Sequence, residues 1–310
     1  MKGRNPLLAV CALALLALAG CTDSTAQVKR FASATTALSD SAKAAYKLVD
    51  DSAVQRKMYA IASDPQLQPD TKTFDTFFES TNKTEDLAVR LQLLKQLSDY
   101  ASALSELATT DFRSDVDKAS TDLQASLVSL RDTYNKASGK TSSISDQNLS
   151  IISTAVDAIG GAIVEWKRQA ALRTIIKVAN PGVQEAANLI KVDLGGKSAL
   201  SDYVGVKLNQ IEFSLYTAYN QDKAGTNANF STRLAFLEFI HTFHTMNSGH
   251  EKYFADVSKG AEQIGKAHAA LTNAAEQDKL TSDQIVKSVS ELAAYAKSVN
   301  EFYKSLQPSK

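Results

Sequence analysis

The chain has 310 residues with 34 basic and 34 acidic side chains, so its formal net charge is zero at pH 7. Both signs are interspersed along the sequence, and no block of like charge stands out. Nucleic acid is a poor partner for such a chain, because its binding depends on clustered Lys and Arg side chains that neutralise phosphates. The sequence therefore predicts no nucleic-acid partner, and its length allows one large core or two smaller ones.

A short basic start and an apolar run open the chain. Two basic residues precede a charge-free stretch from Leu7 to Ala19, which ends in small residues directly before Cys21. This order of charged, apolar and small residues is typical of a secretory signal. The run is too short to cross a bilayer as a helix, which takes about 20 apolar residues. We therefore interpret residues 1–20 as a leader rather than a membrane span.

The end of this run resembles a known processing signal. It consists of Leu18, Ala19, Gly20 and Cys21. These residues resemble the lipobox of bacterial lipoproteins, in which a small residue precedes the cysteine and a leucine usually lies three places before it. The resemblance implies cleavage before Cys21 and acylation of its thiol and new amino group with chains such as palmitate. Several chains give firm attachment, because a single one holds a protein to a bilayer only marginally. The alternative is an ordinary secretory leader with an incidental cysteine.

The residue after the cysteine indicates where the protein is sorted. Thr22 follows Cys21, and in enteric-type sorting this resembles the pattern released to the outer membrane. We therefore expect a lipoprotein anchored in the bacterial outer membrane and facing the periplasm, with residues 21–25 as the lipidated cysteine and a short tether. The only other cysteine, Cys11, lies in the leader. The folded part thus has no thiol for a disulfide, a metal or a nucleophile.

The remainder has the composition of an all-α protein. Only four prolines follow the leader, and Ala, Leu, Ser, Lys, Glu and Asp dominate the runs between them. Apolar residues recur three and four places apart, which is the period of an amphipathic helix. We expect helices over residues 26–63, 73–80, 87–108, 111–134, 144–179, 181–192, 199–222, 230–246, 250–276 and from 281 onward.

The spacing of these helices predicts their arrangement. Short connections favour antiparallel neighbours, and apolar spacing that alternates four and three in the last helix suits long helices packed at a shallow angle, as in a coiled coil. The predicted fold is therefore an all-α, elongated antiparallel up-and-down bundle of long helices. A polar break at Gly139–Ser143 predicts an N-terminal sub-domain over residues 26–138 and a C-terminal one over residues 144–310, or one continuous bundle.

Two local features of the second half lead to further predictions. Asn180 and Pro181 form a good N-cap followed by a proline at the first helical position, so we expect a helix to begin there. Trp166 is the only tryptophan and is followed by basic residues. We expect it to lie in the core, and contact with a lipid headgroup surface is the alternative.

Three of the four histidines lie within ten residues and form the only candidate metal site. Its members are Glu238, His241, His244, His250 and Glu251. His241 and His244 share a helix face, and a turn at Gly249 could bring His250 and Glu251 back toward them as zinc ligands. The spacing matches no established signature, since Glu-x-x-His occurs once and di-iron bundles need it twice. The alternative is that these side chains flank an aromatic stripe and bond to the backbone.

Catalytic motifs are missing from the sequence. There is no Gly-x-Ser-x-Gly elbow, and the two Gly-Lys-Ser/Thr triplets lack the earlier glycine of a phosphate loop. The sequence thus predicts a protein that is not an enzyme and needs no cofactor. We interpret it as an envelope lipoprotein whose helices bind an unidentified envelope protein or support envelope structure. The alternatives are a helical metal or small-ligand binder that uses the histidine cluster, and a membrane-active protein that exposes the helix over residues 151–164.

Overall fold

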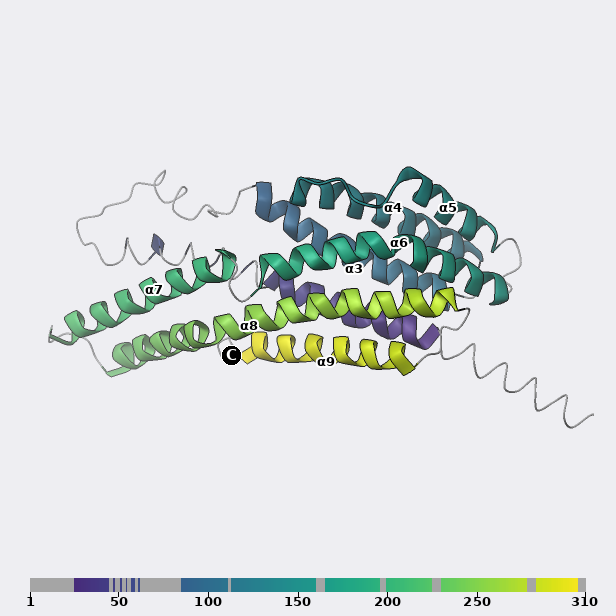
Figure 1. Ribbon diagram of the computed structural model, residues 1–310. Coiled ribbons are helices and arrows are strands. Elements are labelled where there is room, and N and C mark those ends of the chain that lie inside the picture. The colour runs from purple at the N-terminus through teal and green to yellow at the C-terminus, as the bar shows by residue number, and fades with distance from the viewer. Residues whose placement is uncertain are drawn as a thin grey trace, which may run out of the picture. The chain divides into compact units, whose positions relative to one another are not determined.

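The protein is all-α wherever its structure is described (Figure 1). Its computed structural model describes residues 25–44, 47, 51, 54, 57, 58, 61, 85–110, 113–159, 165–195, 199–224, 230–277 and 283–305. Every regular element within these ranges is an α-helix, as the sequence predicts. The leader, the tether up to residue 24, and the predicted helix over residues 73–80 lie outside the described residues.

The helices follow the apolar periodicity of the sequence. Residues 25–44 are helical, and the later helices are α3 (Glu85–Thr109), α4 (Arg113–Ser138), α5 (Asp146–Asp157), α6 (Glu165–Asp193), α7 (Ala199–Ala224), α8 (Phe230–Glu276) and α9 (Asp283–Ser305). In α4 and α9 five residues of each predicted apolar stripe are buried, and Tyr134 and Tyr303 at their C-terminal ends are half-buried. The buried residues are Val116, Ala119, Leu123, Leu127 and Leu130 in α4, and Ile285, Val289, Leu292, Ala296 and Val299 in α9.

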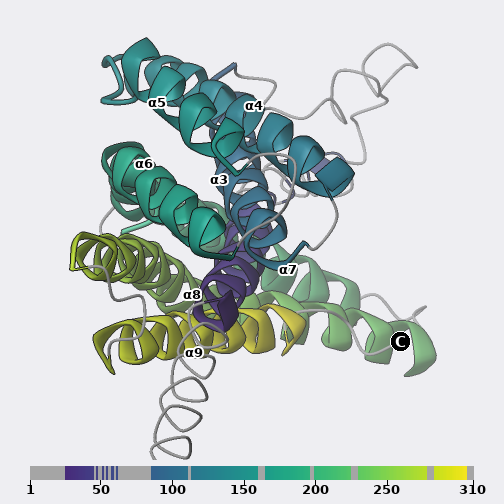
Figure 2. The same ribbon diagram turned by 90° about the vertical axis from the view of Figure 1, so that its right-hand side faces the viewer.

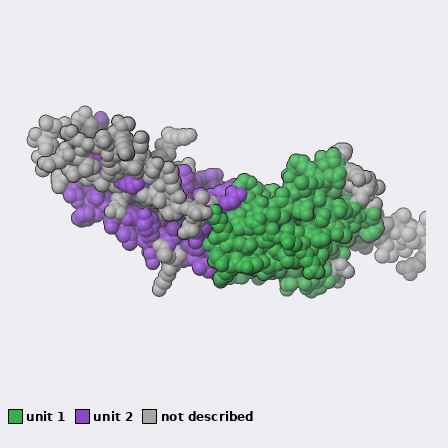
Figure 3. Space-filling model, turned by 90° about the horizontal axis from the view of Figure 1, so that it is seen from above, with its two compact units in different colours: residues 1–37, 95–187, 262–294 green, residues 38–94, 188–261, 295–310 purple. Residues whose placement is uncertain are grey.

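The chain divides into two compact units, each built from three separate stretches of sequence (Figure 3). Unit 1 comprises Met1–Ala37, Lys95–Ala187 and Glu262–Ala294, and unit 2 comprises Leu38–Leu94, Asn188–Ala261 and Tyr295–Lys310. The boundaries follow contacts rather than chain order, so several helices contribute residues to both units. The sub-domains that we expect from the break at Gly139–Ser143 remain a prediction.

Unit 1 has an aliphatic core to which each of its helices contributes. α4 and α5 lie side by side in both views (Figures 1 and 2), and α5 presents a single buried face to its neighbours. Burying such apolar surface contributes roughly 25 cal/mol per Å². The most deeply buried side chains include Phe31, Leu97, Leu104, Leu107, Leu123, Leu127, Ile175, Ile176, Val183, Leu271 and Leu292.

Unit 2 is organised around two aromatic residues in the middle of α8. Tyr253 and Phe254 are almost fully buried, and their ring centroids lie 5.9 Å apart. The hydroxyl of Tyr253 donates to the backbone carbonyl of Ser41 at 2.5 Å. A buried hydroxyl with a partner avoids the desolvation penalty that it would otherwise incur. Tyr253 thereby links the N-terminal helix to α8 at Ser41.

α6 continues through Pro181, where the sequence predicts a new helix, so that prediction is wrong. A proline inside a helix costs about 3 kcal/mol. The apolar face of α6 is nevertheless buried both before and after Pro181, and this burial outweighs the unfavourable helix propensity of the proline. Pro181 has no N–H to donate to the backbone carbonyl of Lys177, four residues earlier, and Lys177 is an exposed residue. The buried residues are Ile175, Ile176 and Ala179 before Pro181 and Val183, Ala186 and Ala187 after it.

α8 is a single helix of 47 residues, so the expected turn at Gly249 is also wrong. A methyl group at Gly249 would lie 2.3 Å from Cζ of Phe302. The glycine therefore permits close approach of an aromatic ring of α9 to the α8 backbone. That ring packs 5.5 Å from the ring of Tyr253. Packing of Phe302 thus explains a glycine that would otherwise cost the helix about 1 kcal/mol.

The loop between α4 and α5 is fixed by a carboxylate from α6. Gly139 begins it with a φ of 67°, a conformation that glycine adopts without strain. Farther along, Glu185 accepts hydrogen bonds from the hydroxyl of Ser142 at 2.8 Å and from the backbone N–H of Ser143 at 3.0 Å. Ser145 then caps α5 by accepting from the N–H of Asn148 at 3.2 Å. The break that the sequence predicts here is therefore present, and it is ordered by hydrogen bonds.

Candidate functional site

The predicted lipidation site lies outside the described residues. This holds for Leu18, Ala19, Gly20 and Cys21 alike. The structure therefore leaves the anchor as a prediction from the sequence. Among the residues that are described, none of the helices combines the length and the apolar character that crossing a bilayer requires.

The structure does not bring the histidine cluster together. His241, Glu238 and Glu251 lie on exposed positions of α8, whereas His250 is buried and donates through Nδ1 to the carbonyl of Asn247 at 2.6 Å. The turn that would gather the ligands is absent, because α8 is continuous at Gly249. Over the described ranges, no group of three or more His, Cys, Asp or Glu side chains is placed to hold a metal ion.

His244 contacts a neighbouring helix instead. Its Nδ1 lies 2.7 Å from Oε1 of Glu212 on α7, and Asn247 donates to the other oxygen of Glu212 at 2.6 Å. Asn247 also donates to Asn209 of α7 at 2.8 Å. Burial alone would raise the pKa of Glu212, but the hydrogen bonds from His244 and Asn247 lower it on balance. These four side chains form a polar bridge between α7 and α8.

A second histidine site, which the sequence analysis missed, lies inside unit 1. His268 on α8 is fully buried, with Nε2 2.8 Å from the hydroxyl of Tyr100 and Nδ1 3.0 Å from Oδ1 of Asn180. Gln184 donates to the same Asn180 oxygen at 3.2 Å and to the carbonyl of Gly265 at 2.6 Å. We call Tyr100, His268, Asn180 and Gln184 the polar chain. Because Asn180 accepts at Nδ1, the ring is a neutral tautomer that accepts from Tyr100.

Burial determines the protonation of the polar chain. It lowers the pKa of His268 to about 3 and raises the pKa of Tyr100 above its ordinary value. Both groups are therefore neutral at pH 7. The ring of Phe31 closes one side, with its centroid 5.6 Å from that of His268. Tyr100 and His268 have no exposed surface, so this end of the polar chain offers no entry to a substrate, and its hydrogen bonds join the helices.

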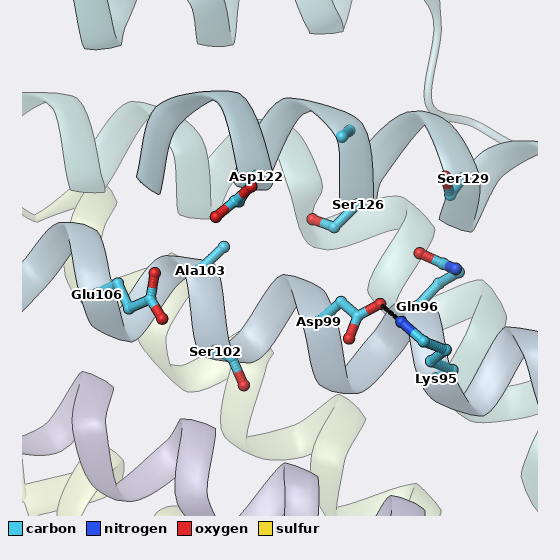
Figure 4. Close-up of a pocket in the computed structure, with 10 residues that line it drawn as sticks. Lys95, Gln96, Asp99, Ser102, Ala103, Glu106, Asp122, Ser126 and Ser129 are labelled. Carbon is cyan, nitrogen blue, oxygen red and sulfur yellow. Dashed lines mark hydrogen bonds and ion pairs between the residues drawn. The ribbon is translucent and has the colours of Figure 1, made fainter. Parts of the chain in front are cut away.

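A polar groove of about 350 Å³ lies between α3 and α4 in unit 1 (Figure 4). Its carboxylates come from Asp99 and Glu106 on α3 and Asp122 on α4, and its other walls are mostly small side chains. Lys95 pairs with Asp99 at 2.5 Å, and Lys118 pairs with Asp122 at 2.9 Å. Pairs of this exposed kind contribute little to stability. The groove can admit small polar solutes, but it lacks the apolar walls of a typical ligand pocket.

The most unusual surface in the described residues belongs to α7 and the first half of α8. Apolar side chains on α7 lie at Val206, Phe213 and Tyr216, which are exposed by 53%, 73% and 44%. On α8 they lie at Phe230, Leu234 and Leu237, which are exposed by 71%, 43% and 43%. Within each helix the members are three, four or seven places apart and therefore share a face. We call these six residues the α7–α8 flank.

The polar bridge shows that both stripes face the same way. Asn209 falls on the α7 stripe, three places after Val206, and His244 falls on the α8 stripe, seven places after Leu237. Both belong to the bridge that joins the helices through Glu212 and Asn247. The apolar residues of α7 and α8 consequently lie on one side of the helix pair.

The two helices of this pair run antiparallel. Gly205 lies against His250, Asn209 against Asn247, and Tyr219 against Phe236. Positions thus descend on one helix as they ascend on the other. A methyl group at Gly205 would lie 2.6 Å from Nε2 of His250, so the glycine allows the helices to approach closely. The flank therefore sits on a well-packed helix pair.

Trp166 also differs from its prediction. It is 67% exposed on α6, so the expectation of a core position is wrong, and the ammonium of Lys167 lies 5.9 Å from its ring centroid. It belongs to unit 1 and is therefore not a member of the α7–α8 flank, which belongs to unit 2. Its neighbour Arg168 is largely buried and donates to the carbonyl of Thr110 at 2.8 Å. Anchoring of that arginine leaves the tryptophan on the outer side of the helix.

Comparison with known proteins adds no family to this picture. The chain matches no protein-family model, no curated protein and no solved structure.

Proposed function

We propose that this protein is a lipid-anchored lipoprotein of the bacterial envelope that acts by binding protein rather than by catalysis. Attachment would be through acylated Cys21, in the outer membrane and facing the periplasm. The sequence Leu-Ala-Gly-Cys at residues 18–21 supports the anchor. The α7–α8 flank supports the mode of action, and it is the observation that carries the proposal.

The flank favours protein binding for a simple physical reason. Exposed apolar patches beyond a few hundred Å² are uncommon on soluble monomers and mark places where a partner binds. Aromatic residues are enriched in such interfaces. Phe213 and Phe230 are the most exposed large apolar residues among those described. Leaving them in water has no benefit for the fold, so a partner that covers them is the economical explanation.

We further propose that the helices form an elongated antiparallel up-and-down bundle. Support comes from the antiparallel pairing of α7 with α8 and from the length of α8, which at about 1.5 Å per residue is roughly 70 Å long. Small-angle X-ray scattering of the mature protein should give a maximum dimension well above that of a sphere of equal mass. A compact, near-spherical profile would contradict this arrangement.

The anchor can be tested with the two cysteines of the chain. Mass spectrometry of the protein from its native cells should show an N-terminal acylated Cys21 and loss of residues 1–20. Cys21→Ser should abolish acylation and membrane retention, whereas the matched control Cys11→Ser in the leader should leave both intact. An unmodified N-terminus in the wild-type protein, or equal behaviour of the two variants, would contradict the anchor.

Protein binding can be tested separately. Chemical crosslinking in intact cells should produce a species larger than the monomer. Phe213→Glu on the flank should remove that species, and Trp166→Glu, an equally drastic change at an exposed aromatic residue outside the flank, should preserve it. Circular dichroism should show that both variants retain their helix content. If no crosslinked species forms, protein binding is the wrong function.

A further inference from the structure

We propose that the partner covering the α7–α8 flank is a second copy of this chain, which binds through the same flank. The inference rests on the proposed protein-binding function and names its partner. In a two-fold symmetric pair, the same patch serves on both subunits, so the patch must be large enough and compatible with itself.

The size of the flank suits such a pair. Three aromatic and three aliphatic side chains, each exposed by 43% or more, present on the order of 600 Å² of surface. A standard interface takes about 800 Å² from each partner, and its polar rim supplies the part that is not apolar. The exposed side chains Asn209, Gln210 and Thr217 adjoin the stripe on α7 and can form that rim.

The charge of the flank also suits self-association. Residues near a two-fold axis meet their own copies, so a charged stripe would repel itself. The α7 stripe and its rim carry Val, Asn, Gln, Phe, Tyr and Thr, with no charged side chain among them. Of the carboxylates on this side, Glu212 beside Phe213 is only 14% exposed and is already paired with His244, and exposed Asp202 and Glu238 lie four places from Val206 and Leu234. A second copy therefore meets no repulsion at the centre of the flank.

The same composition argues against a bilayer as the occupant. Helices that lie on membranes combine an apolar face with many Lys and Arg side chains that attract anionic lipid. Beside the flank, α7 offers Lys207, which lies 5.1 Å from the ring centroid of Tyr203, and α8 offers Arg233. Two separated basic residues do not form such a face.

Helix geometry completes the argument. The flank lies on two adjacent antiparallel helices whose apolar positions are three, four or seven places apart, a spacing with which long helices pack at a shallow angle. Placing two such pairs face to face yields four helices around one apolar core, the arrangement of a four-helix bundle. Anchoring of both copies in the same membrane would raise their effective concentration for this contact.

A photo-crosslinking phenylalanine analogue at Gln210 tests the proposal directly. Gln210 is exposed and adjoins Phe213 on the α7 stripe. In the full-length chain, expressed in its native cells, irradiation should give a product of twice the monomer mass that contains only this chain. The same analogue at Gln124, an exposed position on α4, should give no such product. Phe213→Glu and Leu237→Glu should each lower the yield at least about tenfold, and Trp166→Glu should not.

Other products would identify other occupants. A product containing a different protein, lost in Phe213→Glu, would overturn the second copy while preserving the protein-binding function. Adducts with lipid alone would overturn both, as would the absence of any product with a protein. A homodimer whose yield is unchanged in Phe213→Glu and Leu237→Glu would place self-association elsewhere and overturn the proposal.

Discussion

The two units depart from the ordinary pattern of apolar interior and polar surface in opposite ways. Unit 1 holds polar side chains inside, where Tyr100, His268 and Asn180 form a hydrogen-bonded chain. Unit 2 holds apolar side chains outside, where Phe213 and Phe230 are exposed on the α7–α8 flank. In unit 1 the buried polar side chains find hydrogen-bond partners within the chain. In unit 2 the apolar side chains of the flank remain exposed to solvent.

This difference separates a structural role from a binding role. A buried polar group is costly unless it finds partners, and each member of the polar chain has one. Such a network fixes how helices pack without needing anything further. An exposed apolar face gains free energy only when another surface covers it. We therefore expect changes in unit 1 to alter stability and changes on the flank to alter association.

The largest expected effect is a loss of stability at acid pH. The pKa of His268 is about 3 in the folded protein against 6.5 for the unfolded chain, so only the unfolded state gains this proton between those values. Stability from the neutral ring is complete above pH 6.5 and is lost as the pH falls to 3, by at most about 5 kcal/mol. Urea unfolding across this range should show the decline. His268→Gln should flatten it, and His241→Gln at an exposed position should not.

The next effect contrasts two phenylalanines of unit 2. Phe254 is fully buried, so Phe254→Ala should lower the free energy of unfolding by about 4 kcal/mol through lost burial and a cavity. Phe213 is 73% exposed, so Phe213→Ala should change it by less than about 0.5 kcal/mol. Denaturant melts of monomeric protein at low concentration measure both. A large loss of unfolding free energy in Phe213→Ala would mean that the flank is part of the core.

The hydroxyl of Tyr100 should contribute more to stability than that of exposed Tyr203. Tyr100→Phe leaves Nε2 of buried His268 without its hydrogen bond and should cost about 2 kcal/mol. Tyr203→Phe, at a residue that is 38% exposed, should cost less than about 0.5 kcal/mol. Equal losses in the two variants would show that the polar chain contributes nothing specific.

The smallest effect concerns the polar bridge. The side chain of His244 is 60% exposed, so His244→Gln should cost less than about 1 kcal/mol. Its hydrogen bond helps to lower the pKa of Glu212, so the substitution should raise that pKa. Unfolding measurements and carboxyl NMR titration test the two statements. A loss as large as that expected for Tyr100→Phe would mean that the polar bridge contributes as much to stability as the polar chain.

Much of the fold could be predicted from the sequence, because a helix with one apolar stripe has apolar residues at a regular spacing of three and four. The stripes of α4 and α9 are examples, since five residues of each are buried as the apolar spacing predicts. The helix boundaries predicted at Pro181 and Gly249 are wrong because local sequence does not show long-range packing. Both are helix breakers by local propensity, yet each is held in a continuous helix by packing with residues distant in sequence. For Gly249 the decisive neighbour is Phe302, which no local window contains.

The sites were harder to predict than the fold. His241, His244 and His250 are close in sequence and predict a metal site, but the continuous helix α8 has no turn at Gly249 that would bring His250 back to the other two. The fully buried histidine, His268, hydrogen-bonds to Tyr100, 168 residues away. The flank did leave a signal, since α7 has apolar residues on two sides: Leu208 and Leu215 are buried while Val206 and Phe213 are exposed. A helix that is apolar beyond one stripe predicts a second contact surface.

The loop between α4 and α5 has one further consequence, for proteolysis. Its glycine and serines resemble the exposed segments where proteases cut. A protease, however, needs a stretch of backbone that can detach and extend into its active site. Glu185 binds both the hydroxyl and the backbone of this loop from the side, and Ser145 binds the start of the following helix. Limited digestion should therefore spare this loop, and fragments that end between α4 and α5 should not accumulate.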